Sequence, residues 1–210
     1  MHGLSGWGGG ALVALGAFHG LNPAMGWLFA VAIGFRDRAR SAVVWALGPI
    51  ALGHAASMAL TVVAVEELRI VSSDAAIRIA AALGLLAFAV SRLTRTHPHP
   101  RWVGMNLRPR ELALWSFLMS TAHGAGLMLI PVVIGTQVSA HHDMLMPTSL
   151  GLVGLAVAIH TLAMVAVAGA IAVVVYEFVG VGILRRGWIN VDRLWVYALV
   201  GGAAAILLVP

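Results

Sequence analysis

The sequence predicts an all-α integral membrane protein with six transmembrane helices arranged as a 3+3 inverted-topology repeat. Of its 210 residues, 60% are hydrophobic and only 10% are charged, whereas about a quarter of a typical soluble domain is charged. Successive apolar runs are long enough to meet the roughly 20 residues that a helix needs to cross a bilayer. Short polar motifs recur in the same order in both halves of the chain. We therefore expect a single transmembrane domain over 1–210, with repeat halves at about 6–94 and 111–209.

The apolar runs define the elements in order along the chain. They are unbroken, which favours helices over the alternating segments, roughly ten residues each, of a membrane barrel. The first run lacks the basic start and small-residue cleavage site of a signal peptide, so we expect it to be retained. The predicted helices lie at about 6–35, 41–65, 74–94, 111–135, 148–177 and 193–209.

The arginines predict how these helices are oriented. All 13 basic residues are Arg, and eleven of them fall in or beside connections that share one side of the membrane. Only Arg69 and Arg78 fall on the other side. The positive-inside rule then predicts a multi-pass protein of the cell (cytoplasmic) membrane with both termini outside the cytoplasm. The net charge of +5 is explained by these connections and does not indicate a nucleic-acid partner.

Two pairs of matching motifs indicate the repeat. Residues 17–20 (Ala-Phe-His-Gly) match 121–124 (Thr-Ala-His-Gly), and residues 54–58 (His-Ala-Ala-Ser-Met) match 160–164 (His-Thr-Leu-Ala-Met). The His residues of the two motifs lie 35 residues apart in the first half (19 to 54) and 37 apart in the second (123 to 160). Three helices per half is an odd number, so the second half must enter the membrane from the opposite side. Many secondary transporters have this architecture, with substrate sites near the midplane.

Four histidines are the candidate functional residues. His19, His54, His123 and His160 each fall roughly halfway along a predicted helix, so we expect them at similar depth. Ionisable residues inside a membrane are costly and are functional candidates by default. Neutral imidazole is the commonest metal ligand. The sequence therefore predicts a transition-metal site, with nickel, cobalt, zinc or copper as candidates, as one tetrahedral site or two smaller ones.

Side chains one helical turn from these histidines are candidate secondary ligands or gating residues. Met58 and Met164 each lie four residues beyond a motif His, on the same helix face. A thioether is a soft ligand that favours copper(I) over magnesium or calcium. Ser57 and Thr161 are candidate hydroxyl partners for imidazole nitrogens.

The Asn22-Pro23 step predicts a kink or break in the first helix. Proline removes a helix hydrogen bond, and the residue before it is pushed away from helical geometry. Freed carbonyls and half-helix ends are the parts from which discontinuous-helix binding sites are made. We expect Asn22 and Pro23 to supply ligands or to gate the path, and Pro131 to have a similar effect in the fourth helix.

Two absences narrow the chemistry. There is no Cys, which excludes thiolate ligands, Cys nucleophiles and disulfides. No Asp or Glu falls in the middle of a predicted helix. A central cation would therefore be bound without a carboxylate, which also keeps a neutral or anionic substrate open.

Two segments resemble a known family. Residues 16–23 (Gly-Ala-Phe-His-Gly-Leu-Asn-Pro) and 52–57 (Leu-Gly-His-Ala-Ala-Ser) are similar to the first two helices of the NicO-type nickel/cobalt permeases and their UreH relatives. The resemblance implies six or more helices and transport of a divalent transition metal, with His19 and His54 as ligands. Where that family has an acidic residue this chain has Asn22, and where it usually has a second His this chain has Met25.

The leading hypothesis is therefore a transporter that binds a transition-metal ion at the midplane, with the lipid bilayer and a small inorganic ion as its partners. Protonation of the His residues would couple transport to a proton gradient. One alternative is a membrane-embedded metalloenzyme or haem protein that uses the same His residues. Another is a carrier of a small organic or anionic solute that needs no metal. The sequence assigns no catalytic residue and leaves the ion and the oligomeric state open.

Overall fold

The structure, a computed structural model, describes residues 6–71, 73–94, 107–128, 149–180 and 192–208. These ranges contain helices and turns and no strand, which confirms the predicted all-α class. A further helical stretch begins at residue 125. The elements are α1 (Gly6–Leu21), the 3-10 turn η1 (Pro23–Met25), α2 (Trp27–Asp37), α3 (Arg40–Val71), α4 (Asp74–Thr94), α5 (Pro109–Ala122), α7 (Ser149–Val174), the π turn η2 (Val175–Val179) and α9 (Asp192–Leu208).

Two of the predicted helices are interrupted. The helix predicted over 6–35 is divided into α1 and α2 at Asn22-Pro23, as the proline suggested. The prediction of one continuous helix over 111–135 was wrong, because α5 ends at Ala122 and a turn follows at His123 and Gly124. Gly124 has a left-handed φ of +68°, which glycine adopts without steric cost. Pro131 lies outside the described residues.

Local chemistry explains the break after α1. Asn22 is extended (φ −74°, ψ 119°), and its side-chain oxygen accepts a 3.0 Å hydrogen bond from the Ala24 amide. Pro23 opens the 3-10 turn, where its missing N–H costs nothing. Gly26 then takes φ +114°, a conformation that strains any other residue. The chain therefore closes one helix and starts the next within five residues, 22–26.

Two indole groups hold this break in place. Trp115 of α5 donates a 3.2 Å hydrogen bond from Nε1 to the Ala24 carbonyl, and Trp27 points Nε1 at the Leu21 carbonyl at 3.4 Å. Both indoles are buried. Carbonyls that a broken helix leaves unsatisfied are thus paired within the protein, which a dry interior demands.

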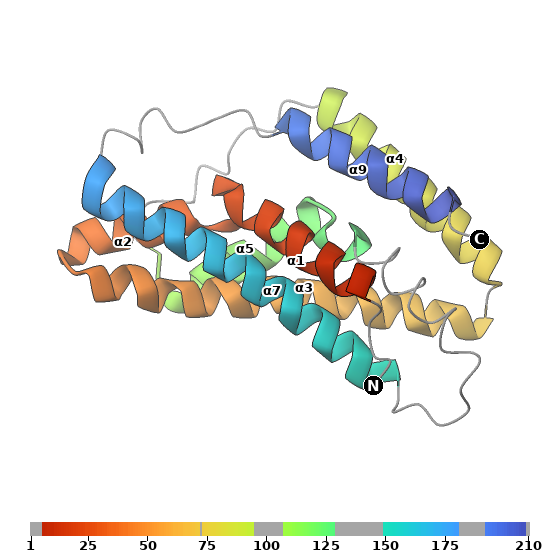
Figure 1. Cartoon of the computed structure of the whole chain (residues 1–210), viewed down its shortest axis with the longest axis horizontal. Helices are drawn as coiled ribbons and strands as arrows, with labels where there is room; N and C mark the ends of the chain where they lie inside the picture. Colours follow the sequence, from red (N-terminus) through yellow and green to blue (C-terminus); the bar gives the residue numbers. More distant parts are fainter. Residues whose placement is uncertain (1–5, 72, 95–106, 129–148, 181–191, 209–210) are drawn as a thin grey trace.

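The helices pack in pairs (Figure 1): α1 lies along α7, α3 along α5, α3 against α7, and α4 along α9. Glycines permit the closest of these contacts. A Cβ at Gly16 would collide with the His160 backbone, and one at Gly53 would collide with the backbone of Ala113 in α5. Small residues are the usual means of bringing helix backbones together inside a membrane.

The α4–α9 pair lies to one side of the other helices (Figure 1). Its apolar seam, which includes Leu85 and Leu199, also contacts Met128 beyond α5. At the end of the pair, the Arg78 guanidinium donates hydrogen bonds of 3.1 and 3.0 Å to the Ile206 carbonyl. This contact satisfies a carbonyl in the last turn of α9 and places positive charge at the negative end of that helix.

The interior of this bundle is mainly apolar but includes polar side chains, and many large apolar side chains are exposed on its surface. Two helical segments, Arg40–Val65 and Val153–Val179, are long and apolar enough to cross a membrane by length and composition. Trp45 is 79% exposed and Phe178 is 83% exposed. The described polar residues that are buried are His19, Asn22, His54, Ser57, Ser116, Ser120, His123, His160 and Thr161.

The glycine contacts give a test of the helix packing. We expect Gly53→Ala to lower the free energy of unfolding by about 1–3 kcal/mol, because the added methyl group meets the α5 backbone. Gly48→Ala is the matched control on the same helix, since a Cβ there meets nothing within 4 Å. The measurement is thermal unfolding of the purified variants. Equal transition temperatures for the two variants would contradict the α3–α5 contact.

Candidate functional site

Three of the predicted histidines meet in the interior. His19 comes from α1, His54 from α3 and His160 from α7, and each is fully buried. Their ring centroids are separated by 4.8 Å (His19 to His160), 5.5 Å (His19 to His54) and 5.5 Å (His54 to His160). These residues, called here the His cluster, bring side chains distant in sequence into one triangle where three helices pack.

The spacing of the rings suits a metal ion, but their orientation does not. Three imidazoles that bind one tetrahedral ion through nitrogens at about 2.0–2.1 Å have ring centres about 5 Å apart. The planes of His54 and His160 are nearly parallel, at 6°, while His19 is inclined to them by 69° and 72°. Within the described ranges, no group of three or more His, Cys, Asp or Glu side chains is arranged to hold a metal ion. Binding would therefore require the rings to turn.

The hydrogen bond of His19 determines its tautomer. Its Nδ1 lies 2.9 Å from the Leu15 carbonyl, one turn earlier in α1. A carbonyl oxygen only accepts, so Nδ1 carries the proton in the neutral ring and Nε2 carries the lone pair. This arrangement is the one in which metal-binding imidazoles are usually held, with the second nitrogen donating to a carbonyl.

His54 is held from a different helix. Its Nδ1 forms a 2.7 Å hydrogen bond with the Ser120 hydroxyl of α5, and both residues are fully buried. Nε2 of His54 has no hydrogen-bond partner among the described residues. The serine therefore orients the ring and leaves one nitrogen available to a ligand.

His160 is the least restrained member of the cluster. Neither of its ring nitrogens has a hydrogen bond of ordinary geometry to a described residue, although the Leu12 carbonyl lies close enough to interact. The hydroxyl of the neighbouring Thr161 also lacks a partner among these residues. Buried polar atoms without partners are rare in folded proteins and require an explanation, such as a bound ion or water.

The repeat motifs explain this difference between His54 and His160. Ser120 lies three residues before His123, and Gly16 lies three residues before His19. The serine at this position bonds to His54, whereas the glycine admits the α7 backbone at His160 and offers no hydroxyl. His54 is thus oriented by a hydroxyl from the other half of the chain, whereas His160 has the Leu12 carbonyl of the other half nearby.

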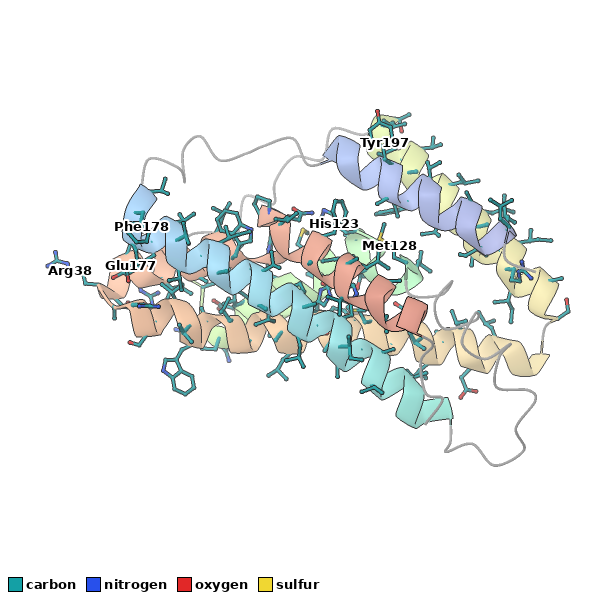
Figure 2. All side chains as sticks on the ribbon, viewed as in Figure 1. Arg38, His123, Met128, Glu177, Phe178 and Tyr197 are labelled. Carbon is teal, nitrogen blue, oxygen red and sulfur yellow. The ribbon has the colours of Figure 1, made fainter. Side chains whose placement is uncertain are left out.

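His123 occupies the end of α5. It is buried, and its Nδ1 lies 2.7 Å from the Met119 carbonyl, which fixes the same tautomer as in His19. Figure 2 shows His123 and Met128 on the side of the bundle that faces the α4–α9 pair. The ring contacts that define the cluster join His19, His54 and His160. His123 is related to the cluster through its own helix, because it lies three residues after Ser120, which bonds to His54.

The other predicted residues have structural partners. Met58 and Met164 are fully buried in two separate apolar clusters. The Ser57 hydroxyl lies 2.8 Å from the Thr121 hydroxyl. The side-chain oxygen of Asn22 accepts a hydrogen bond from the Ala24 amide, in the turn that follows α1. Their roles as secondary ligands or gating residues stay predictions.

Sequence analysis missed three polar contacts made by α5. Ser116 donates a 2.8 Å hydrogen bond to the Ile50 carbonyl, Ser120 bonds to His54, and Trp115 bonds to the first helix break. A signal was present: Ser116, Ser120 and His123 are spaced by four and three residues, which places them on one helix face. A polar stripe on an apolar helix would have identified the face that contacts α3.

Comparison with known proteins adds no assignment. No protein family model matches the chain, and no curated protein or solved structure is significantly similar to it. The similarity of residues 16–23 and 52–57 to nickel/cobalt permeases therefore stays a prediction.

The Ser120–His54 contact gives the second test. Replacing Ser120 by Ala leaves a buried imidazole nitrogen without its partner, so we expect a loss of about 1–3 kcal/mol in unfolding free energy. Ser91→Ala is the matched control. The Ser91 hydroxyl is only partly buried and bonds to the Phe88 carbonyl within its own helix, α4. Thermal unfolding of both variants provides the comparison. A Ser120→Ala variant no less stable than the control would show that the hydroxyl does not hold His54.

Proposed function

We propose that this protein is a membrane transporter that carries a transition-metal ion through the His cluster. The observation that carries the proposal is the meeting of three fully buried imidazoles from three helices, with ring centres 4.8–5.5 Å apart. Structural histidines have their nitrogens satisfied by protein groups. Here Nε2 of His54 has no hydrogen bond to a described residue, and among those residues the Leu12 carbonyl is the protein group that interacts with His160.

The exposed apolar side chains of the bundle are compatible with a lipid bilayer. Many large apolar side chains, such as Trp45, Leu52 and Leu162, are exposed on the bundle. Extensive exposed apolar surface is unusual for a water-soluble monomer and is typical of a surface that contacts lipid or a partner. Beyond the two long apolar helices, we propose that the remaining predicted helices also cross, with both termini outside the cytoplasm as the arginines indicate.

The helix contacts support an inverted repeat. If the first, second and third predicted helices exchange with the fourth, fifth and sixth, the α1–α7 contact becomes the α5–α3 contact. The same exchange leaves the α3–α7 and α4–α9 contacts unchanged. In both halves the first helix also breaks just beyond its motif His, at Asn22 and at Gly124. Discontinuous helices beside a central site are typical of transporters built from such repeats.

Transport would proceed by turning the rings toward an ion. Nε2 of His19 is set as a lone-pair donor by the Leu15 carbonyl, and Nε2 of His54 is left available by Ser120. His160, near the Leu12 carbonyl and without a side-chain partner among the described residues, would complete the site. A proton and a metal ion compete for the same lone pair, so protonation would release the ion and link transport to a proton gradient.

Two alternatives differ in what the cluster would hold. A haem between two axial imidazoles would separate their ring centres by about 6 Å or more, so the observed spacing disfavours a bis-imidazole haem at the cluster. A metalloenzyme with a single ion would use the same ligands. A carrier of a small organic or anionic solute is favoured only by the lack of carboxylates near the cluster in sequence.

Transport in proteoliposomes tests the proposal. We expect His54→Gln and His160→Gln to reduce uptake of the transported ion by about 10–100-fold, the usual effect of disturbing a metal site. Nickel, cobalt, zinc and copper are each assayed, and size-exclusion chromatography reports folding. His97→Ala, in the connection between the third and fourth predicted helices, is the control. Folded His54 and His160 variants that transport as well as the control would contradict a His-lined path.

A further inference from the structure

The helices that form the His cluster have no acidic residue close to it, which bears on the charge of the ion that the cluster could carry. Helix α1 contains no acidic residue. On α3 the nearest acid to His54 is Glu66, twelve residues away, or about 18 Å along the helix. On α7 and its continuation, the nearest acid to His160 is Glu177, about 25 Å away.

The remaining described acids lie at helix ends. Asp37 closes α2 and pairs with Arg36, and Glu111 lies in the first turn of α5, where it accepts from the Arg108 amide. Figure 2 shows Glu177 at the same end of the molecule as Arg38, and its carboxylate lies 3.9 Å from Arg40. The helices that form the cluster therefore supply neutral ligands and no nearby negative charge.

This charge balance discriminates between ions by their valence. The free energy needed to take an ion out of water rises with the square of its charge, so a divalent ion costs about four times as much as a monovalent ion of the same radius. Neutral imidazoles solvate a cation with dipoles but cancel none of its charge. Proteins normally offset a buried charge with an opposite charge, and the described part of the cluster has none.

The donor set points to the same class of ion. Imidazole nitrogens suit copper and zinc, and thioethers select soft ions such as copper(I). The cluster itself presents three imidazoles, whereas Met58 and Met164, one helical turn beyond His54 and His160, pack in two separate apolar clusters. Monovalent ions with a filled d shell accept two or three such donors without requiring a fixed geometry.

We propose that the cargo of the His cluster is a monovalent soft cation, of the copper(I) or silver(I) type, rather than a divalent ion. This inference rests on the proposed function and narrows it. It departs from nickel and cobalt, which the family resemblance implies.

Competitive binding tests the proposal. The purified protein is dialysed against silver(I), or against copper(I) with ascorbate, in the presence of a large excess of nickel(II), cobalt(II) and zinc(II). Bound metal is then measured by mass spectrometry of the digested sample. We expect one monovalent ion per chain, undisplaced by the divalent ions and lost in the His19→Gln/His160→Gln variant. That variant retains every Met, so it controls for binding to thioethers elsewhere.

Each other outcome has a defined meaning. Stoichiometric binding of a divalent ion that the His variant loses would overturn the monovalent cargo and leave the transporter proposal standing. Silver binding that the His variant retains would also overturn it, because the ion would then be held outside the cluster. Binding of no ion of either valence would contradict the proposed function itself.

Discussion

The cost of burying imidazole rings is the constraint on which this structure depends. Three of them meet inside a bundle whose exterior is apolar, so their nitrogens must find partners within the protein or in a bound ligand. Gly16 brings α1 against α7 within the triangle, and Gly53 brings α3 against α5, the helix that supplies Ser120. The Leu15 carbonyl and the Ser120 hydroxyl satisfy one nitrogen each on His19 and His54. Nε2 of His54 has no partner among the described residues, and the rings of His19 and His160 lie beside it, which makes the cluster a candidate binding site.

The two halves of the chain contribute unequally to this region. Matching positions hold Gly16 in one half and Ser120 in the other, so His54 receives a hydroxyl partner and His160 does not. His54 is therefore oriented by a side chain of another helix, whereas His160 has the Leu12 carbonyl nearby and no side-chain partner among the described residues. The backbone also leaves helical geometry just beyond both motif histidines, at Asn22 and at Gly124.

Hydrophobicity was enough to predict most of the helices, and proline chemistry was enough to predict the break at Asn22. The predicted helix over 74–94 has the bounds of α4. The break at Gly124 could not be predicted, because a glycine within an apolar run is as compatible with close packing as with a turn. Which histidines share a cluster was also beyond the sequence, since depth and repeat symmetry do not determine helix crossings. Ser120 was overlooked because its role appears only when α3 and α5 are placed together.

X-ray absorption spectroscopy on the metal-loaded protein tests the central claim most directly, because it reports the atoms bound to the ion. Ligation by the His cluster predicts about three nitrogen neighbours near 2.0 Å, with the outer-shell scattering that rigid imidazole rings produce. The signal from those rings should decrease when His160 is replaced by Gln. A first shell made only of oxygen atoms, or one unchanged by that replacement, would contradict the assignment of the cluster as the binding site.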